Sequence, residues 1–448
     1  MDRQAVHEGR VDSVWLAGET TYEPTRRLTG VRRADVAIIG GGFTGVSTAY
    51  HLSKQHPDKR ILILEAHELA SGASGRNGGL VLTGLPGLHP RDPDEYREHY
   101  EMSREGIDLI ESIIKENKLP VPFRREGCLK VFTSQRRADI AAAETERRHA
   151  AGVPEEFLAG EVLDDWIRMR GVKGAILDPT AGQLNGARFV RSLRPILANR
   201  GVEIYERTPV ISIQEGSEVR LETMAGEVRA RAVVLATNAY TPRLGYFKNQ
   251  LIPIHSHVLA TEPLSNEEWG EIGWRRGCGF TDDLSRLAYG AMTAQGQMVF
   301  GGGSNASYDY LFGSRASLFG RRERATNAVY KQLGRYFPRA RLVGVHQRWS
   351  GAIGMTFNRV PTIGVRGSHR NVYYAVGYSG FGITMSNLAG KILCDIYSDD
   401  DDRWRTLPFY CREPEWIPPE PFRWIGYKLF TGLIGSSPRG WYRESLRG

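Results

Sequence analysis

The strongest indication of the fold in this chain of 448 residues is Asp35-Val-Ala-Ile-Ile-Gly-Gly-Gly-Phe-Thr-Gly45. An apolar run leads into a turn whose glycines, Gly40, Gly42 and Gly45, occupy the first, third and sixth positions of the dinucleotide-binding pattern. The first glycine makes the turn, the second lets the backbone approach a pyrophosphate, and the third lets the following helix pack closely on the sheet. The free N–H groups at the start of that helix would face the phosphates.

The second strand of the unit, Ile61-Leu-Ile-Leu64, is a continuous apolar run, typical of a parallel strand that is covered on both faces. It ends at Glu65, 20 residues after Gly45. A carboxylate at this distance accepts hydrogen bonds from a ribose diol and repels a 2′-phosphate. The unit therefore predicts FAD or NAD and excludes NADP. An ordinary glycine turn is the alternative, which the agreement of strand, helix, second strand and terminal acid disfavours.

A second glycine-rich loop, Ser71 to Leu80, distinguishes FAD from NAD. Nicotinamide-binding units do not normally carry such a loop after their acidic strand, whereas the ribityl chain of a flavin needs the backbone to approach again. Within it, Ala73-Ser-Gly-Arg-Asn-Gly-Gly79 resembles the loop of the D-amino-acid oxidase superfamily of FAD-dependent oxidoreductases. The likeness is greatest to the gamma-glutamylputrescine oxidase branch, with glycine oxidase and sarcosine oxidase more distant. A flexible glycine loop is the alternative.

Composition limits the class of protein. With 41% hydrophobic and 25% charged residues, the chain is typical of a globular protein with two or three domain-sized cores. The first ten residues are charged and no apolar run approaches membrane-spanning length, so we predict a cytoplasmic protein without a transmembrane segment. The net charge of +8 comes from scattered arginines, which disfavours a nucleic-acid partner and suits attraction of an anionic substrate. No metal site is predicted, because metal-ligand spacing is missing from the cysteines, Cys128, Cys278, Cys394 and Cys411.

The order of the elements predicts an α/β fold in which a Rossmann-type FAD-binding domain is interleaved with an antiparallel-sheet α+β substrate domain, as in proteins like glutathione reductase and D-amino-acid oxidase. The assigned ranges are an N-terminal arm at 1–34, the FAD-binding domain at 35–85, 181–240 and 346–397, the substrate domain at 86–180 and 241–345, and a tail at 398–448.

Both ends of the chain carry apolar anchors. Trp15 and Leu16 are expected to fix the arm to the domain. The tail contains an amphipathic, aromatic segment from Phe422 to Ile434. We expect this segment to dock on its own domain; a membrane-surface helix or a partner contact is the alternative.

Two later stretches extend the resemblance over most of residues 35–397. Trp349 to Gly364 is similar to the family's tryptophan-glycine strand and asparagine-arginine-x-proline turn. Asn371 to Thr384 is a buried strand that enters a third glycine-rich turn, and a helix is expected from Ser386 to Tyr397. The resemblance implies that this helix start faces the pyrimidine edge of the isoalloxazine and favours the negative charge of reduced flavin. It also implies that the backbone of Val210 meets the adenine, although a plain core valine is the alternative.

The candidate FAD-binding residues lie in the three glycine-rich turns and at the ends of nearby strands: Gly40, Gly42, Phe43, Thr44, Gly45, Glu65, Ala66, Ser74, Gly75, Arg76, Asn77, Gly78, Gly79, Leu80, Val210, Thr237, Asn238, Gly351, Gly377, Gly380, Phe381, Gly382, Ile383 and Thr384. Covalent relatives tether FAD through a cysteine near the segment aligned with Gly351 to Met355. This chain has none there, so FAD is predicted to be noncovalent.

The reaction that the resemblance implies is oxidation of a C–N bond in an amine or amino acid. A hydride equivalent passes to flavin N5, water hydrolyses the imine, and reoxidation by O2 gives hydrogen peroxide. The catalytic residues are not predicted individually. The pocket candidates are aromatic, imidazole and guanidinium side chains that also suit a core: Tyr246, His255, His257, Tyr289, Trp349, Arg359, Tyr378 and Phe381.

Three enzymatic alternatives and one that is not an enzyme stay open. An arginine that clamps the substrate carboxylate in glycine-oxidase relatives is missing near Ile353, and a lysine linked to oxygen activation is missing from Gln297 to Phe300. The chain is therefore predicted to be an amine oxidase, a dehydrogenase that uses another acceptor, or an amino-acid oxidase that holds the carboxylate elsewhere. The alternative outside enzymology is a flavin-binding partner or membrane-surface subunit. Neither a particular substrate nor an oligomeric state is predicted.

Overall fold

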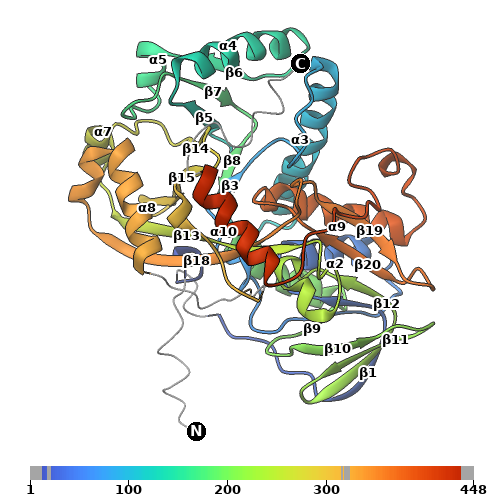
Figure 1. The fold of residues 1–448 in the computed structure, drawn as a ribbon. Coiled ribbons are helices and arrows are strands. Elements are labelled where there is room, and N and C mark those ends of the chain that lie inside the picture. The colour runs from blue at the N-terminus through green and yellow to red at the C-terminus, as the bar shows by residue number, and fades with distance from the viewer. Residues whose placement is uncertain (1–12, 18–21, 314–315, 317–322, 435–448) are drawn as a thin grey trace.

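The computed structural model describes residues 13–17, 22–313, 316 and 323–434. Two large sheets organise these residues, with helices on their faces (Figure 1). The helices are α1 Val14–Ala17, α2 Phe43–Gln55, α3 Pro93–Glu116, α4 Gln135–Ala150, α5 Gly160–Asp164, α6 Gly186–Asn199, α7 Asn266–Ile272, α8 Glu323–Tyr336, α9 Gly382–Tyr397 and α10 Phe422–Ile434. The predicted combination of a nucleotide-binding sheet with a mainly antiparallel one is confirmed.

The eight-stranded sheet holds the predicted nucleotide-binding unit. Its order is β10-β11-β12-β1-β2-β9, and β20 pairs with β12 and β19. The strands are β1 Gly30–Ile39, β2 Ile61–Leu64, β9 Glu203–Tyr205, β10 Val210–Gln214, β11 Val219–Thr223, β12 Gly226–Leu235, β19 Thr362–Arg366 and β20 Val372–Val376. Parallel pairing of β1 with both β2 and β12 buries Val36 to Ile38 completely, as the apolar run of β1 predicts.

Helices α2 and α9 pack closely together on this sheet. The hydroxyl of Ser47 in α2 donates to the carbonyl of Asn387 in α9 at 2.7 Å. A Cβ built on Gly390 would lie 2.3 Å from the Ser47 hydroxyl oxygen, so only glycine permits this approach. The close packing brings the starts of the two helices to the same edge of the sheet, where the strands β1 and β20 end (Figure 1).

The nine-stranded sheet has the order β17-β13-β16-β15-β14-β5-β7-β6, with β18 also paired to β13. Only the β14–β5 pair is parallel among its described strands. The strands are β5 Cys128–Phe132, β6 Glu156–Leu158, β7 Gly174–Asp178, β13 Ile252–Pro263, β14 Gly279–Asp282, β15 Ala288–Met292, β16 Gln297–Gly302, β17 Tyr308–Tyr310 and β18 Val345–Met355. The apolar periodicity from Leu318 to Phe337 predicts a helix here. Helix α8 begins at Glu323 among the described residues, and 317–322 lie outside them.

The predicted domain division remains a prediction, and the strand pairing differs from it at one point. Residues 346–397 were assigned to the nucleotide-binding part, yet β18 lies in the nine-stranded sheet because it pairs with β13 from Ile252 to Thr261. A small third sheet, β3-β8-β4, joins the two regions. Its strands are β3 Leu80–Val81, β4 Phe123–Arg124 and β8 Gly182–Leu184.

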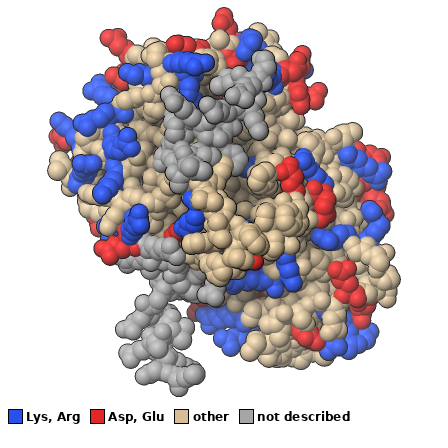
Figure 2. Space-filling view, viewed as in Figure 1, with Lys and Arg blue, Asp and Glu red and all other residues tan. Residues whose placement is uncertain are grey.

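Both predicted anchors of the chain ends lie against the molecule. In α1, Trp15 and Leu16 are buried. Helix α10 packs on its own chain, since the side-chain amide of Asn305 donates to the carbonyl of Thr431 at 2.6 Å. In the part of the chain that the structure describes, no helix is both long enough and apolar enough to cross a membrane. Figure 2 shows Lys and Arg side chains interspersed with Asp and Glu on the viewed face.

Candidate cofactor and substrate site

The first glycine turn connects β1 to α2. Its backbone is left-handed at Gly40, with φ of 110°, and the Gly40 N–H donates to the carbonyl of Leu64 at 2.9 Å. A Cβ built on Gly45 would lie 1.9 Å from the Gly40 carbonyl oxygen, so any side chain there would overlap the turn. Helix α2 starts at Phe43 without a side-chain cap. The N–H groups of its first turn lack intrahelical acceptors; Ser74 accepts that of Phe43, and those of Thr44 and Gly45 are available to an anion.

The second glycine loop lies against this helix start. The hydroxyl of Ser74 accepts the N–H of Phe43 at 2.9 Å. The loop is braced from within, because the Asn77 side chain accepts from the Gly79 N–H at 2.9 Å and donates to the Ser74 carbonyl at 2.8 Å. Trp15 from the N-terminal arm donates to the Asn77 carbonyl at 2.8 Å. The loop then enters β3 at Leu80.

The third glycine turn, between β20 and α9, reaches the same place. The hydroxyls of Tyr378 and Thr44 are hydrogen-bonded at 2.7 Å. Asn238, three residues after the end of β12, accepts the Gly377 N–H through its side chain at 3.1 Å. A Cβ built on Gly380 or Gly382 would meet nothing within 4 Å, so the start of α9 opens onto free space.

Helix α9 begins four residues earlier than the expected Ser386. It starts at Gly382, with Phe381 as the preceding, partly buried residue. Ile383 and Thr384 are buried in its first turn, and the Thr384 hydroxyl donates to the Leu82 carbonyl at 2.7 Å. The helix start is thereby fixed to the residue that follows β3.

Glu65 follows β2 beside the first turn. One carboxylate oxygen accepts the Gly41 N–H at 2.7 Å and the other accepts the His67 N–H at 2.8 Å. Burial nevertheless raises the pKa of Glu65 from 4.5 to about 6. The neighbouring Ala66 is exposed. Binding of a ribose by Glu65 stays a prediction.

The other candidates on this sheet lie at strand ends. Val210 is the first residue of β10, at the sheet edge, and is partly buried rather than in the core. Thr237 follows β12, and its hydroxyl is bonded to that of Thr241 at 2.8 Å.

Aromatic side chains of the nine-stranded sheet form the opposite wall. A Cβ built on Gly78 would lie 2.5 Å from the ring of Tyr289 in β15. The Tyr289 hydroxyl is bonded to the Ser256 hydroxyl at 3.0 Å, and burial raises the pKa of Tyr289 to about 12. Trp349 in β18 donates from Nε1 to the Arg76 carbonyl at 3.0 Å. The second glycine loop therefore lies between the nucleotide-binding sheet and this aromatic wall.

Gly351 explains why β18 can approach that loop so closely. A Cβ built on Gly351 would lie 3.1 Å from the Arg76 side chain. The Arg76 guanidinium is buried and donates from Nε to the Ser71 carbonyl at 2.9 Å, which fixes the preceding turn around Gly75. Arg76 and Gly351 therefore lie in contact, and both are among the candidate FAD-binding residues named from the sequence.

Two histidine candidates lie on the other face of the nine-stranded sheet. His255 and His257 flank Ser256 in β13, and side chains alternate along a strand, so the histidines point away from Tyr289. Both are buried, and His257 Nε2 lies 3.8 Å from the Asp309 carboxylate. The structure does not bring them to the aromatic wall.

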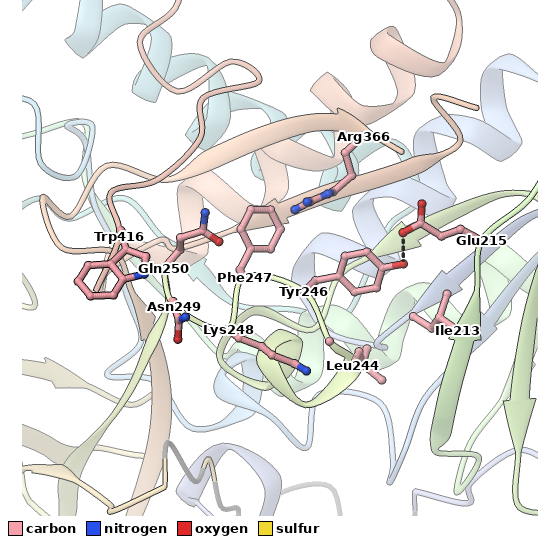
Figure 3. Close-up of a pocket in the computed structure, with 11 residues that line it drawn as sticks. Ile213, Glu215, Leu244, Tyr246, Phe247, Lys248, Asn249, Gln250, Arg366 and Trp416 are labelled. Carbon is pink, nitrogen blue, oxygen red and sulfur yellow. Dashed lines mark hydrogen bonds between the residues drawn. The ribbon is translucent and has the colours of Figure 1, made fainter. Parts of the chain in front are cut away.

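Tyr246 lies in a separate groove of about 530 Å³ (Figure 3). Its hydroxyl donates to Glu215 at 2.7 Å. The guanidinium of Arg366 lies over the rings of Tyr246 and Phe247, at 5.7 and 5.0 Å from their centres. None of the glycine turns lines this groove. Arg359 is placed apart as well, in a turn that lies against Gly87.

The sequence interpretation missed two polar residues of the aromatic wall, Ser256 and Tyr308, and it missed Arg286, whose guanidinium lies 5.9 Å from the ring centre of Tyr308. Ser256 lies directly opposite Tyr308 in the β13–β17 pair and bonds to Tyr289. The alternation of β13 was a usable signal, because a strand that points His255 and His257 one way must point Ser256 the other way. The residue types alone do not indicate which face of β13 lies toward the cofactor.

The residues present fit FAD. Three glycine turns meet at the start of α2, an acid follows the second strand, and free space lies before Gly382. This fold and site define an FAD-binding protein of the nucleotide-binding α/β class.

Comparison with known proteins identifies the family within this class. Residues 35–396 match the model of the family described as FAD dependent oxidoreductase (DAO), so the chain belongs to that family. It is 27% identical to gamma-glutamylputrescine oxidoreductase of Escherichia coli (strain K12) over 416 residues, 89% of this chain and 92% of the relative. It is also 27% identical to the probable oxidoreductase OrdL of Haemophilus influenzae over 388 residues, 84% of this chain and 85% of the relative.

A solved structure shares the fold. The crystal structure of glycine oxidase from Geobacillus kaustophilus matches with a TM-score of 0.72 and 20% identity, over 85% of this chain and 99% of the other. The predicted family, FAD cofactor and oxidoreductase class are confirmed. The individual site residues stay predictions.

Proposed function

We propose that this FAD-dependent oxidoreductase oxidises the C–N bond of an amine or amino acid. The substrate loses two electrons and two protons to become an imine, and water converts the imine to a carbonyl compound and an amine or ammonia. When bound, FAD accepts the two electrons and passes them to O2, which becomes hydrogen peroxide, or to another acceptor. The names of the relatives support an amine or amino acid as substrate.

The observation that carries the proposal is the contact between Gly78 and Tyr289. It places an aromatic wall of the nine-stranded sheet beside the glycine turns that suit FAD. Tyr289 and Trp349 would orient a small substrate and exclude water from it. Because the pKa of Tyr289 is raised to about 12, its hydroxyl keeps its proton at neutral pH and remains a hydrogen-bond donor.

Noncovalent attachment of FAD belongs to the same proposal. The segment from Gly351 to Met355 contains no cysteine, and Cys128, Cys278 and Cys394 are buried elsewhere. Heat or acid denaturation should release the flavin into the supernatant. Flavin that stays with the precipitated chain would contradict this part of the proposal. A cytoplasmic location also remains a prediction.

Anaerobic mixing of the FAD-loaded protein with a panel of amines and amino acids tests the reaction. We expect at least one compound to bleach the visible flavin band, with a carbonyl product formed in equal amount. If no compound bleaches it, amine oxidation is refuted. Admission of air then identifies the acceptor: recovery of colour with hydrogen peroxide indicates an oxidase, and absence of recovery indicates a dehydrogenase.

A further inference from the structure

Arg286 is a buried cation with few partners. The residue is 8% exposed, and it forms no ion pair with any residue that the structure describes. Its one hydrogen bond within the described ranges runs from Nε to the side-chain oxygen of Asn305 at 3.0 Å. A buried guanidinium normally needs a counter-charge or several acceptors, because removal of its charge from water is costly.

The other buried arginines have such partners. Arg191 is paired with Glu68 at 3.5 Å. Arg423 donates to the carbonyls of Pro418 and Lys248 and to the side chain of Asn249, at 2.8 to 3.0 Å. Arg286 differs because no described acceptor is bonded to either of its terminal nitrogens.

Two tyrosines flank the Arg286 guanidinium. Its central carbon lies 5.9 Å from the ring centre of Tyr308 and 5.6 Å from that of Tyr427. The Tyr427 hydroxyl is buried and has no hydrogen-bond partner among the described residues. Burial raises the pKa of Tyr427, so this hydroxyl is a donor at neutral pH. The Arg286 guanidinium and the Tyr427 phenol therefore lie close together, and each has hydrogen-bond donors without an acceptor among the described residues.

This place is continuous with the aromatic wall of the candidate substrate site. Tyr308 is directly opposite Ser256 in the β13–β17 pair, and Ser256 is bonded to Tyr289. A substrate whose nitrogen lies near Tyr289 would therefore extend past Ser256 and Tyr308 toward Arg286. The anion would be recognised several atoms from the oxidised bond.

Helix α10 covers this end of the site. In Figure 1 the helix, drawn in red, passes in front of the nine-stranded sheet. The rings of Tyr427 and Tyr310 are in contact, with centres 5.5 Å apart. The Asn305 side chain links Arg286 to α10, because it accepts a hydrogen bond from Arg286 and donates one to the Thr431 carbonyl of α10 at 2.6 Å.

We propose that Arg286 and Tyr427 form a binding site for an anionic group of the substrate, closed by α10. The group is a carboxylate separated by several atoms from the C–N bond that is oxidised. A carboxylate suits the pair because it accepts two parallel bonds from a guanidinium and a further bond from a phenol. This inference rests on the proposed function for the position of the nitrogen, but the anion site can be tested separately.

Binding of simple dicarboxylates tests the site without turnover. Calorimetric titration of the FAD-loaded protein with the series from succinate to pimelate should show binding of at least one member. In Arg286→Met the same compound should bind at least about tenfold more weakly, the usual effect of losing a charge-assisted hydrogen bond. The matched control is Arg366→Met, which removes a guanidinium from the separate groove and should leave binding unchanged. Absence of binding in the wild type, or equal weakening in both variants, overturns the inference.

Paired substrates separate this inference from the proposed function. Wild type should turn over 5-aminopentanoate with a lower KM than 1-aminopentane. Arg286→Met should raise KM for the acid at least about tenfold and change that for the neutral amine by less than about twofold. Arg286→Lys and Tyr427→Phe should give intermediate increases in KM for the acid. These two variants replace Arg286→Met in the test if that variant does not fold. Equal effects on both amines refute the anion site. Failure of every amine to bleach the flavin refutes the proposed function, while dicarboxylate binding would still support the site.

Discussion

The two sheets contribute to the site in different ways. The eight-stranded sheet contributes turns, in which glycines, backbone N–H groups and a few short side chains such as Ser74 and Thr44 do the positioning. The nine-stranded sheet contributes side chains that stand on one of its faces, among them Tyr289, Ser256 and Trp349. The difference indicates that the glycine turns of the eight-stranded sheet, on the cofactor side, tolerate almost no change of backbone conformation. On the substrate side, the nine-stranded sheet can change its pocket by replacement of individual side chains.

Replacement of Gly45 by Ala should have the largest effect. The new Cβ would lie 1.9 Å from the Gly40 carbonyl oxygen, an overlap with backbone that α2 can relieve only by moving off the sheet. We expect a loss of about 3 kcal/mol in the free energy of unfolding, at the upper end for overpacking. Flavin absorbance per chain and thermal unfolding measure the result.

The matched control for this prediction is Gly270→Ala in α7, where a Cβ meets nothing within 4 Å. This variant should be as stable as wild type or up to about 1 kcal/mol more stable, because alanine favours a helix. Full flavin content in the Gly45 variant would show that the first turn does not need its glycine.

Replacement of Tyr289 by Phe should affect turnover rather than folding. The ring would keep its place against Gly78, while the hydroxyl that bonds to Ser256 would be lost. We expect kcat/KM to fall by about tenfold, as for the loss of one polar contact near the reacting bond.

A histidine variant makes this comparison sharper. His257→Asn changes the opposite face of the same sheet and should leave kcat/KM of the folded fraction within about twofold of wild type. A larger kinetic effect from His257 than from Tyr289 would reverse the assignment of the two faces.

FAD affinity should depend on pH through Glu65. The pKa of Glu65 in the FAD-free protein is raised to about 6, so the folded state retains a proton that the unfolded chain has released between pH 4.5 and 6. The stability of the FAD-free protein should therefore fall over that range as pH rises, by at most about 2 kcal/mol. A ribose diol donates to the ionised form, so the Kd for FAD should fall by up to about tenfold from pH 5 to pH 7.

The variant Glu65→Gln removes the titrating group. Its Kd for FAD should be higher than that of wild type at pH 7 and nearly constant from pH 5 to pH 7. Titration of flavin fluorescence at each pH gives both curves. Parallel curves for the two proteins would assign the pH dependence to another group.

The smallest effect is expected at the N-terminal arm. Trp15→Phe removes the hydrogen bond from the indole to the Asn77 carbonyl, which braces the second glycine loop from outside. Loss of one such bond corresponds to about 1 kcal/mol and so to a roughly fivefold higher Kd for FAD. Trp416→Phe, at a residue 65% exposed in the separate groove, is the control and should bind FAD as wild type does. Equal Kd values for Trp15→Phe and wild type would show that the arm does not support the loop.

The cofactor side was predictable because glycine patterns report directly on the backbone. Positions such as Gly40 and Gly45 are glycine for reasons that hold in any protein with this turn, so their spacing indicated strand, turn and helix together. The substrate side was less predictable, because a strand's residue types do not state which face meets the site. His255 and Ser256 are neighbours in sequence, yet only Ser256 faces Tyr289.

The anion-binding role that we propose for Arg286 could not be predicted from a local sequence pattern. It depends on the lack of described acceptors at its terminal nitrogens and on its proximity to Tyr427, which is 141 residues later in the chain (427 − 286). The aromatic spacing after Phe422 favoured docking of this segment on its own domain, and α10 does so. The segment's place over the strands of the second sheet required tertiary structure.

A crystal structure of the FAD-loaded protein, soaked anaerobically with a substrate amine, would show where flavin and substrate bind. We expect the isoalloxazine between the start of α9 and Tyr289, with the amine on the Tyr289 side. Flavin located elsewhere, or an amine bound on the face that carries His255 and His257, would contradict this expectation.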